Sequence, residues 1–448
     1  MKQSRLSHLL HAALFGGALA ATTTISLLSP ALSPSVQASL QDSPKAVLDE
    51  AWQIVNREYV DTTFNRVDWQ SVRQELLGRE YSSQQEAYDA LRAALHRLDD
   101  PYTRFMDPRQ YDQLTSQTSG ELSGVGIRLQ ANEQTGELAV VEPIPNSPAS
   151  TAGIRSGDRI LAIDGKPTQG MSVEDASNLI RGEVGTRITL RIQREGADAF
   201  DLPLVRARIE LPTVRYSLKQ EGNARIGYIR LNEFSAHASE QMRQAIRDLL
   251  NQHVEGFVLD LRGNPGGLLQ ASVDISRMWL ENGSIVKTVD RDGSSEEIAA
   301  NHTAITDLPL AILVDGNSAS SSEILTGALK DNHRATVVGT QTFGKALVQS
   351  VHSLSDGSGL AVTIAHYYTP NGTDISHRGI APDIQISLSD TQRQRLASTP
   401  NAFATNADPQ YTGAVSALRE TILANRNTPR ALRATISNQE QSLNITPR

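Results

Sequence analysis

Hydrophobic and polar positions divide the chain into segments of different periodicity. From residue 43 to about 117, apolar residues recur at helical spacing, which predicts amphipathic helices. Between residues 120 and 208, short β-like runs are separated by Gly turns, with one helix expected at 173–181. From about 215 to 386, apolar runs alternate with helices, which predicts a buried sheet covered by helices. The pattern therefore predicts a multidomain α/β protein.

Individual elements can be assigned in the second and third segments. In the second segment, strands are expected at 138–141, 160–163 and 188–192. In the third, strands are expected at 225–231, 256–261 and 310–314, and helices at 238–252, 268–280 and 321–330. Beyond residue 390 the sequence is polar, apart from one helical patch at 415–424, and this end is interpreted as an appended tail.

The first residues have the features of an export signal. Lys2 and Arg5 form a positive start, an apolar stretch follows from residue 9 to 28, and Val36-Gln37-Ala38 is a small-x-small cleavage site. We therefore expect a signal peptide over residues 1–38, cleaved after Ala38. The alternative is an uncleaved membrane anchor, because the apolar stretch is long for a signal peptide.

Composition excludes several classes of protein. The 448 residues contain 50 acidic and 42 basic side chains, for a net charge of −8, which argues against a nucleic-acid-binding protein. A hydrophobic fraction of 39% is sufficient for packed cores. The absence of cysteine excludes disulfides, thiolate metal sites and a cysteine nucleophile. The ten histidines are scattered without a metal-binding spacing, so we expect neither a metal nor another cofactor.

A serine-rich segment is the first candidate for chemistry. Residues 314–324 follow a predicted buried strand and open a helix, so backbone N–H groups would converge near a serine at this turn and stabilise an anion. The alternative interpretation is an ordinary helix cap, because Ser320 followed three residues later by Glu323 is a capping box.

Two further segments could complete a catalytic site. Lys345 follows a Gly-rich turn and precedes an apolar strand, so partial desolvation would lower its pKa towards that of a general base able to deprotonate a serine. It could equally be a surface lysine beside a turn, as Lys330 is expected to be at a helix end. Residues 260–267 end in Gly-Gly, whose amides could form an oxyanion hole or simply a tight βα turn.

Taken in their order along the chain, the three segments closely resemble the carboxyl-terminal processing peptidases, which are serine endopeptidases with a Ser-Lys mechanism. The family's Leu-Arg-x-Asn-x-Gly-Gly matches at 261–267, its Ser-Ala-Ser-x-Ser-Glu-Ile at 318–324 and its Thr-Phe-Gly-Lys at 342–345. The resemblance implies catalytic and supporting roles for Ser320 (nucleophile), Lys345 (base), Gln349 (orienting the lysine), Gly266 and Ser321 (oxyanion amides) and Asp331 (a supporting acid). The family usually has Ala at the position of Ser321, so Ser321 and Ser322 stay open as alternative nucleophiles.

A second resemblance concerns the β-rich segment. Residues 119–210 resemble a PDZ module, whose carboxylate-binding loop matches Gly124, Val125, Gly126 and Ile127. Residues 100–103 and 379–383 carry further marks of the peptidase family. The implied domains are a signal peptide (1–38), an N-terminal helical region (39–118), a PDZ domain (119–210), an α/β peptidase core of the crotonase-like or ClpP-like kind (211–390) and a C-terminal tail (391–448).

The resemblance implies an exported endopeptidase that binds the C-terminal tails of proteins or peptides through its PDZ domain and cleaves near that end. It is most similar to cyanobacterial members, which implies the periplasm or thylakoid lumen, with membrane association if the signal is uncleaved. After signal removal no membrane span is expected. The natural substrate and the oligomeric state stay open.

Two alternatives are retained. The chain could be a non-catalytic PDZ adaptor that presents protein C-termini to another protease. It could also hydrolyse substrates through Ser-His-Asp chemistry with His333 or His366 as the base, because the sequence does not show which base lies beside the serine.

Overall fold

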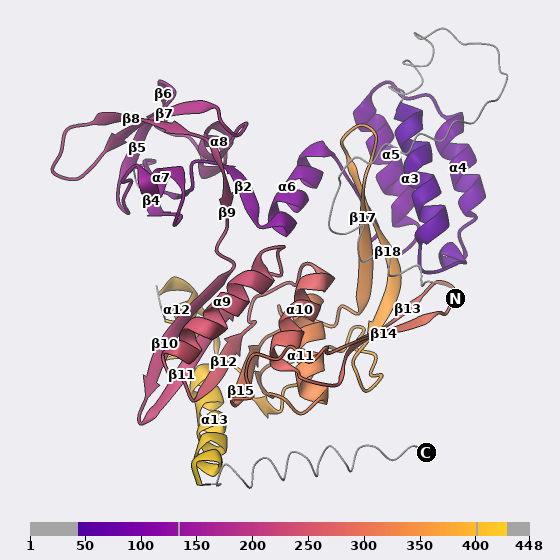
Figure 1. Ribbon diagram of the computed structural model, residues 1–448. Coiled ribbons are helices and arrows are strands. Elements are labelled where there is room, and N and C mark those ends of the chain that lie inside the picture. Colours follow the sequence, from indigo (N-terminus) through magenta and orange to yellow (C-terminus); the bar gives the residue numbers. More distant parts are fainter. Residues whose placement is uncertain (1–43, 133–134, 400–401, 428–448) are drawn as a thin grey trace, which may run out of the picture. The chain divides into compact units, whose positions relative to one another are not determined.

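The computed structural model describes residues 44–132, 135–399 and 402–427, and these fall into two compact units (Figure 1). The smaller unit consists of Thr115–Thr213 and Ser235–His237. The larger unit consists of the described residues up to Leu114, Val214–Phe234 and those from Ala238 onward. The predicted signal peptide lies outside the described residues. Over the ranges that are described, no helix combines the length and apolar character needed to cross a membrane.

The smaller unit is a twisted antiparallel sheet with two helices. Its strands follow the order β3-β4-β5-β7-β8, with β6 paired to β5 and a separate pair of β2 and β9. The strands are β2 (Glu121–Gly124), β3 (Ile127–Ala131), β4 (Leu138–Pro143), β5 (Arg159–Ile163), β6 (Lys166–Pro167), β7 (Arg187–Gln193), β8 (Phe200–Val205) and β9 (Ala207–Glu210). The helices are α7 (Pro148–Thr151) and α8 (Val173–Ile180). The three strands and the helix predicted in this segment are confirmed.

A six-stranded sheet organises the larger unit. Its order is β10-β11-β12-β15-β16-β19, antiparallel between β10 and β11 and parallel elsewhere. The strands are β10 (Val214–Glu221), β11 (Ala224–Leu231), β12 (Gly256–Asp260), β15 (Leu310–Val314), β16 (Thr336–Gly339) and β19 (Ile384–Gln385). The helices between them are α9 (Ala238–Asn251), α10 (Leu269–Trp279) and α11 (Ser321–Asp331). The elements predicted from strand–helix alternation are therefore confirmed.

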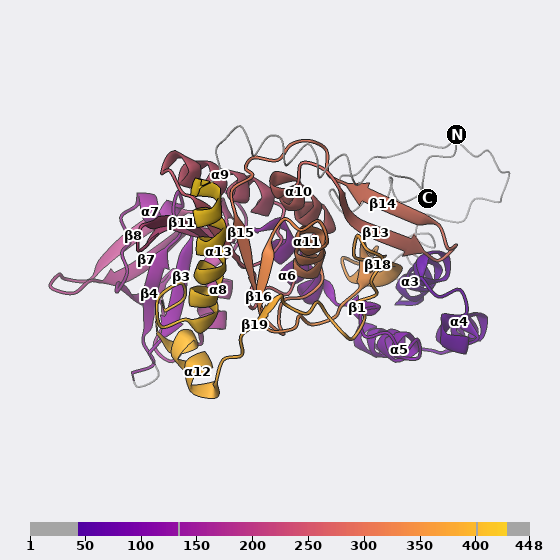
Figure 2. The ribbon, with the colours of Figure 1, turned by 90° about the horizontal axis from the view of Figure 1, so that it is seen from below.

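Both faces of this sheet are covered, because alternate residues of each central strand point to opposite sides. In β12, Phe257 and Leu259 belong to the cluster that contains α9, α10 and α11, whereas Val258 packs with the C-terminal helix α13 (Pro409–Asn427). Figure 2 shows β15 between α13 and the pair α10 and α11. This burial on both sides explains the continuous apolar runs of β12 and β15.

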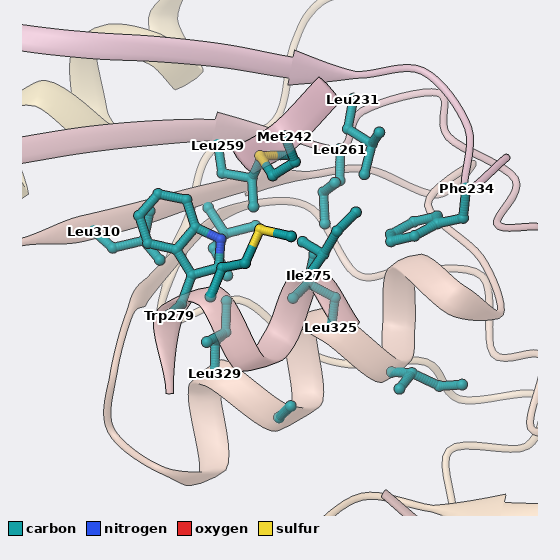
Figure 3. Packing of buried hydrophobic residues seen from close by; sticks show 14 of the residues in the cluster. Leu231, Phe234, Met242, Leu259, Leu261, Ile275, Trp279, Leu310, Leu325 and Leu329 are labelled. Carbon is teal, nitrogen blue, oxygen red and sulfur yellow. The ribbon is translucent and has the colours of Figure 1, made fainter. Parts of the chain in front are cut away.

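The main core lies between the sheet and helices α9 to α11. In Figure 3, Leu259 and Leu310 from the strands meet Trp279 from α10 and Leu325 and Leu329 from α11. All five side chains are buried. Each fully buried aliphatic side chain contributes roughly 1.5–3 kcal/mol. This cluster therefore holds α11 against the sheet and fixes the turn between β15 and α11.

A second sheet carries the N-terminal helices. Its order is β1-β18-β13-β14, with β17 also paired to β18. The strands are β1 (Arg104–Met106), β13 (Ser284–Asp290), β14 (Ser295–Ala299), β17 (Leu347–Ser353) and β18 (Gly359–Tyr368). The N-terminal helices are α3 (Pro44–Glu58), η1 (Phe64–Arg66), α4 (Trp69–Gly78), α5 (Gln84–His96) and α6 (Pro108–Ser119). Helices α3, α4 and α5 share a hydrophobic cluster with β18; α3 and α5 lie against this sheet, and α4 packs on these two helices (Figure 1).

The C-terminal segment packs on the main sheet rather than extending as a polar tail. It contains α12 (Asp390–Ser398) and α13, and α13 buries Tyr411, Val415 and Leu418 against β11, β12 and β15. Just before α13, the Asp408 carboxylate accepts two hydrogen bonds from the Arg262 guanidinium, at 2.8 and 2.9 Å. The polar composition concealed this packing, because only one side of α13 faces the sheet.

Candidate active site

Ser320 occupies a strained turn between β15 and α11. Its backbone has φ +54° and ψ −114°, a conformation that non-glycine residues rarely adopt and that costs of order 1–3 kcal/mol. The turn is held by Glu323, whose carboxylate accepts a hydrogen bond from the Ser320 N–H at 2.9 Å. A serine on a strained strand-to-helix turn presents its hydroxyl above the sheet edge, as the nucleophilic serine does in α/β-hydrolases.

The next two serines use their hydroxyls differently. Ser321 Oγ donates to the carbonyl of Gly267 at 3.0 Å, and Ser322 Oγ donates to the carbonyl of Asn264 at 3.0 Å. Both side chains are buried, whereas Ser320 is partly exposed. Within the described part of the chain, the Ser320 hydroxyl donates to no protein atom. It is therefore the hydroxyl of the three that is available to a substrate.

The Gly-Gly turn lies directly against Ser320. A Cβ on Gly266 would lie 2.9 Å from Ser320 Cβ and 2.8 Å from the carbonyl oxygen of Ala319, so a side chain there has no room. The Gly266 N–H donates to Asn264 Oδ1 at 2.9 Å, and the Asn264 carbonyl accepts the Ala319 N–H at 3.1 Å. The Ser321 N–H has no acceptor among the described residues. Asn264 thus joins the two turns that border the serine.

One buried carboxylate connects the serine turn to the lysine turn. Glu323 is fully buried, and besides the Ser320 N–H it accepts hydrogen bonds from Thr342 Oγ1 at 2.6 Å, Gly344 N at 2.7 Å and Lys345 N at 2.9 Å. On the other side, the buried hydroxyl of Tyr367 contacts the carbonyl oxygens of Lys345 and, at 3.2 Å, Ser320. The backbones of Ser320 and Lys345 are therefore linked through both their N–H and their C=O groups.

The Lys345 side chain is partly buried and lies against an aromatic ring. Its Nζ is 4.4 Å from the centre of the Tyr102 ring, and it donates a hydrogen bond to no oxygen in the described part of the chain. Burial lowers the pKa of the ammonium, and Arg104 lowers it further, whereas Asp100 and Glu323 raise it; the net pKa lies below the ordinary value. Lys345 is therefore partly desolvated, and its assignment as a base stays a prediction.

The structure also locates Gln349, Asp331 and the two histidines considered as alternative bases. Gln349 is on β17, where its Nε2 donates to Thr363 Oγ1 at 3.5 Å. Asp331 is the last residue of α11, and its carboxylate accepts the Asn371 N–H at 3.0 Å, at the opposite end of the helix from Ser320. His333 and His366 are both exposed, and within the described residues neither forms a hydrogen bond with Ser320.

The expected carboxylate-binding loop lies between β2 and β3 in the smaller unit. The carbonyl oxygens of Val125 and Gly126 accept hydrogen bonds from Ala149 and Ile144, at 2.9 Å each. The N–H groups of Val125 and Gly126 have no acceptor in the described part of the unit. Gly126 has φ +81°, and a Cβ there would lie 2.2 Å from Ser147 Cβ. The loop therefore presents free N–H groups next to β3, which is the end strand of its sheet.

Sequence reasoning missed two residues that border the lysine. Tyr102 falls within the family mark at 100–103, and no motif contains Tyr367. Glu323 is the helix cap that the sequence predicts, and it also links the serine turn to Lys345. Each of these roles depends on contacts between segments far apart in the chain, and a local pattern contains no signal for them.

Comparisons with known proteins agree with this geometry. The model of peptidase family S41 matches residues 225–386, and the PDZ domain model matches residues 140–194. A carboxyl-terminal-processing protease of Synechocystis sp. is 43% identical over 374 residues, which cover 83% of this chain and 86% of that protein. The chloroplastic C-terminal processing peptidase of Tetradesmus obliquus is 38% identical over 352 residues, covering 75% of this chain and 76% of that one.

A solved structure of a processing protease also matches the fold of this chain. The photosystem II D1 C-terminal processing protease superposes with a TM-score of 0.52 at 36% identity, covering 82% of this chain and 99% of that one. The family, the PDZ domain and the α/β peptidase fold expected from the motifs are thereby confirmed. The chain belongs to peptidase family S41, as a carboxyl-terminal-processing protease that carries a PDZ domain.

Proposed function

We propose that this protease cleaves peptide bonds with Ser320 as the nucleophile and Lys345 as its general base. The observation that carries the proposal is the position of Glu323, whose carboxylate accepts the N–H groups of both Ser320 and Lys345 at 2.9 Å. A buried carboxylate that is bonded to both turns fixes the position of one turn relative to the other. The strained backbone of Ser320 and the lowered pKa of Lys345 support the same assignment.

The proposed reaction begins when neutral Lys345 accepts the proton of the Ser320 hydroxyl, as the serine oxygen attacks the scissile carbonyl. For this step the lysine amine leaves the face of the Tyr102 ring and turns towards Ser320 Oγ. The same amine then protonates the departing amide nitrogen, and water hydrolyses the acyl-enzyme by the reverse path. Gln349, on strand β17, is proposed to orient the lysine. Asp331, at the opposite end of α11 from Ser320, is proposed only to support the site indirectly.

The oxyanion of the tetrahedral intermediate is proposed to bind the N–H groups of Ser321 and Gly266. The Ser321 N–H is available at the start of α11. The Gly266 N–H would exchange its bond to Asn264 Oδ1 for the oxyanion, because both acceptors compete for one proton. Asn264 is therefore the acceptor that the oxyanion would displace from the Gly266 amide.

Substrate capture is proposed to occur at the loop of Gly124, Val125, Gly126 and Ile127. The free N–H groups of Val125 and Gly126 can bind a terminal carboxylate, and the unpaired edge of β3 can accept the preceding residues as an added strand. Substrates are accordingly proteins or peptides with free C-termini. A non-catalytic adaptor would bind such tails without cleaving them at any pH.

We further propose the boundaries 39–118, 119–210, 211–390 and 391–448 for the segments that follow the signal peptide. Export to the periplasm or thylakoid lumen is supported by the charged and apolar pattern of residues 1–38 and by the chloroplastic relative. N-terminal sequencing of the mature protein tests cleavage after Ala38, and limited proteolysis tests the boundaries.

The catalytic pair is tested with Ser320→Ala and Lys345→Ala against a peptide with a free apolar C-terminus. We expect kcat to fall on the order of a thousand-fold or more in each variant, because neither residue of the pair can perform the role of the other. Chromatography of the products measures kcat. Lys330→Ala is the matched control, since its ammonium binds the Asp383 carboxylate at 2.7 Å rather than the site. Wild-type turnover in either test variant would overturn the assignment.

A further inference from the structure

Tyr102 reaches the lysine from a part of the chain that precedes both recognised domains. It lies just before β1, which pairs antiparallel with β18 in the register Arg104–Ala361. The S41 model begins only at residue 225. The Tyr102 ring nevertheless lies 4.4 Å from Lys345 Nζ, well within the range of a cation–π contact.

The loop that carries Tyr102 is rigidly attached to the second sheet. The Asp100 carboxylate accepts hydrogen bonds from the Tyr102 N–H at 2.9 Å, from Thr103 Oγ1 at 2.7 Å and from Thr363 Oγ1 at 2.7 Å. Thr103 Oγ1 in turn accepts the Thr363 N–H at 3.0 Å. Thr363 lies on β18, the same strand as Tyr367. The Tyr102 ring is therefore positioned by the strand that also contacts the Lys345 backbone.

The contact favours one protonation state of the lysine. The face of an aromatic ring attracts an ammonium but has little attraction for a neutral amine. The other groups that face Lys345 are Arg104 from β1, which disfavours the charge, and Asp100 and Glu323, which favour it. The hydroxyl of Tyr102 itself remains protonated at neutral pH, because burial and the same two carboxylates raise its pKa. The ring, 4.4 Å from Nζ, therefore favours the charged form of Lys345.

We propose that Tyr102 is a positioning residue that holds protonated Lys345 in a resting orientation and sets the pH at which the lysine becomes a base. The proposal rests on the proposed function of Lys345. By stabilising the charged form, the ring raises the pH needed to release the neutral amine. Binding of substrate beside Ser320 would then compete with the ring for the amine.

The test compares kcat/KM as a function of pH for the wild type, Tyr102→Leu and Tyr102→Phe. In Tyr102→Leu the ammonium loses the ring, so the apparent pKa of the acid limb should fall by about half a unit or more. Tyr102→Phe keeps the ring face and should restore the wild-type apparent pKa. A loss of folding alone would not move the acid limb, and circular dichroism melting checks that each variant is folded.

A second measurement does not depend on turnover. In the Ser320→Ala background, an NMR titration of ¹³Cε-labelled lysine, assigned with Lys345→Ala, reports the pKa of Lys345 directly. We expect a lower pKa with Tyr102→Leu and an unchanged one with Tyr102→Phe. An unshifted pKa in Tyr102→Leu, or an equal shift in Tyr102→Phe, would overturn the proposal. Full activity of Lys345→Ala would instead overturn the proposed function, so the two failures are distinguishable.

Discussion

A single side chain, Glu323, organises the candidate site at the scale of residues. Its four hydrogen bonds come from the serine turn and the lysine turn, and the donors on Thr342 and Gly344 would otherwise be buried without a partner. A buried carboxylate is costly unless its oxygens are satisfied, so the two turns and Glu323 stabilise one another. The same arrangement leaves the hydroxyl of Ser320 free while its neighbours are occupied.

The hydroxyls of Ser321 and Ser322 lead to a prediction about the nucleophile. Ser322→Ala should keep turnover within a few-fold of the wild type, and Ser321→Ala, which retains the backbone N–H, should lose far less than Ser320→Ala. Each should lower the free energy of unfolding by about 1 kcal/mol, because a buried carbonyl loses its donor. Steady-state kinetics and urea unfolding measure the two effects. Loss of activity confined to Ser322→Ala or Ser321→Ala would move the nucleophile to that residue.

At the scale of elements, the end strand β3 and the loop before it form the proposed tail-binding edge. Strand β3 pairs with β4 on one side, and the order of the sheet places no strand on its other side. The positive φ of Gly126 turns the chain so that its carbonyl and that of Val125 bond within the unit. The free amides therefore point away from those bonds, where an incoming carboxylate can bind.

This edge predicts a dependence on the terminal charge of the ligand. Amidation of the C-terminus of a tail peptide should weaken binding about tenfold or more, because the loop amides lose a charge-assisted hydrogen bond. Isothermal titration calorimetry measures the affinities. Acetylation of the peptide N-terminus is the control and should leave the affinity unchanged. Equal affinity for the acid and the amide would contradict recognition by this loop.

At the scale of the whole chain, the C-terminal segment completes the support of the Gly-Gly turn. Arg262, in the segment that leads from β12 to Gly266 and Gly267, is buried between Asp260 and Asp408, with an additional bond to Gln410 Oε1 at 3.0 Å. Burial raises the pKa of Asp260, whereas Arg262, Arg230 and Tyr228 lower it, so the net pKa lies below the ordinary value. Residues almost 150 positions apart thus form one charged network.

The network predicts that Asp408 is important for stability. Asp408→Ala should lower the free energy of unfolding by about 3 kcal/mol, because part of the buried Arg262 charge loses its partner. Urea unfolding followed by tryptophan fluorescence measures the change. Asp390→Ala is the control, since Asp390 forms an exposed ion pair with Arg393 on α12 and its loss should have little effect. A similar small effect in Asp408→Ala would show that Asp260 alone neutralises Arg262.

Much of the fold could be predicted because its signals are local. The strands β11, β12 and β15 and the helices α9, α10 and α11 were expected within about one or two residues of their observed ends. The motifs around Ser320 and Lys345 also lie within short segments. By contrast, α13 has a buried side that its mixed composition does not reveal, and the partners of Arg262 could not be read from the turn that contains it.

Periodicity and motifs identify the strands and helices around the candidate site, the family and the residues available for chemistry, because they depend on neighbouring positions. They do not reveal strands β1, β13, β14 and β18 of the second sheet, or which residues meet in the folded chain. Pairing of β1 with β18 brings Tyr102 to Lys345, and the packing of α11 brings Glu323 between the serine and lysine turns. Such contacts depend on the register of strands and on the side of a helix that is buried. Those are properties of the folded chain as a whole.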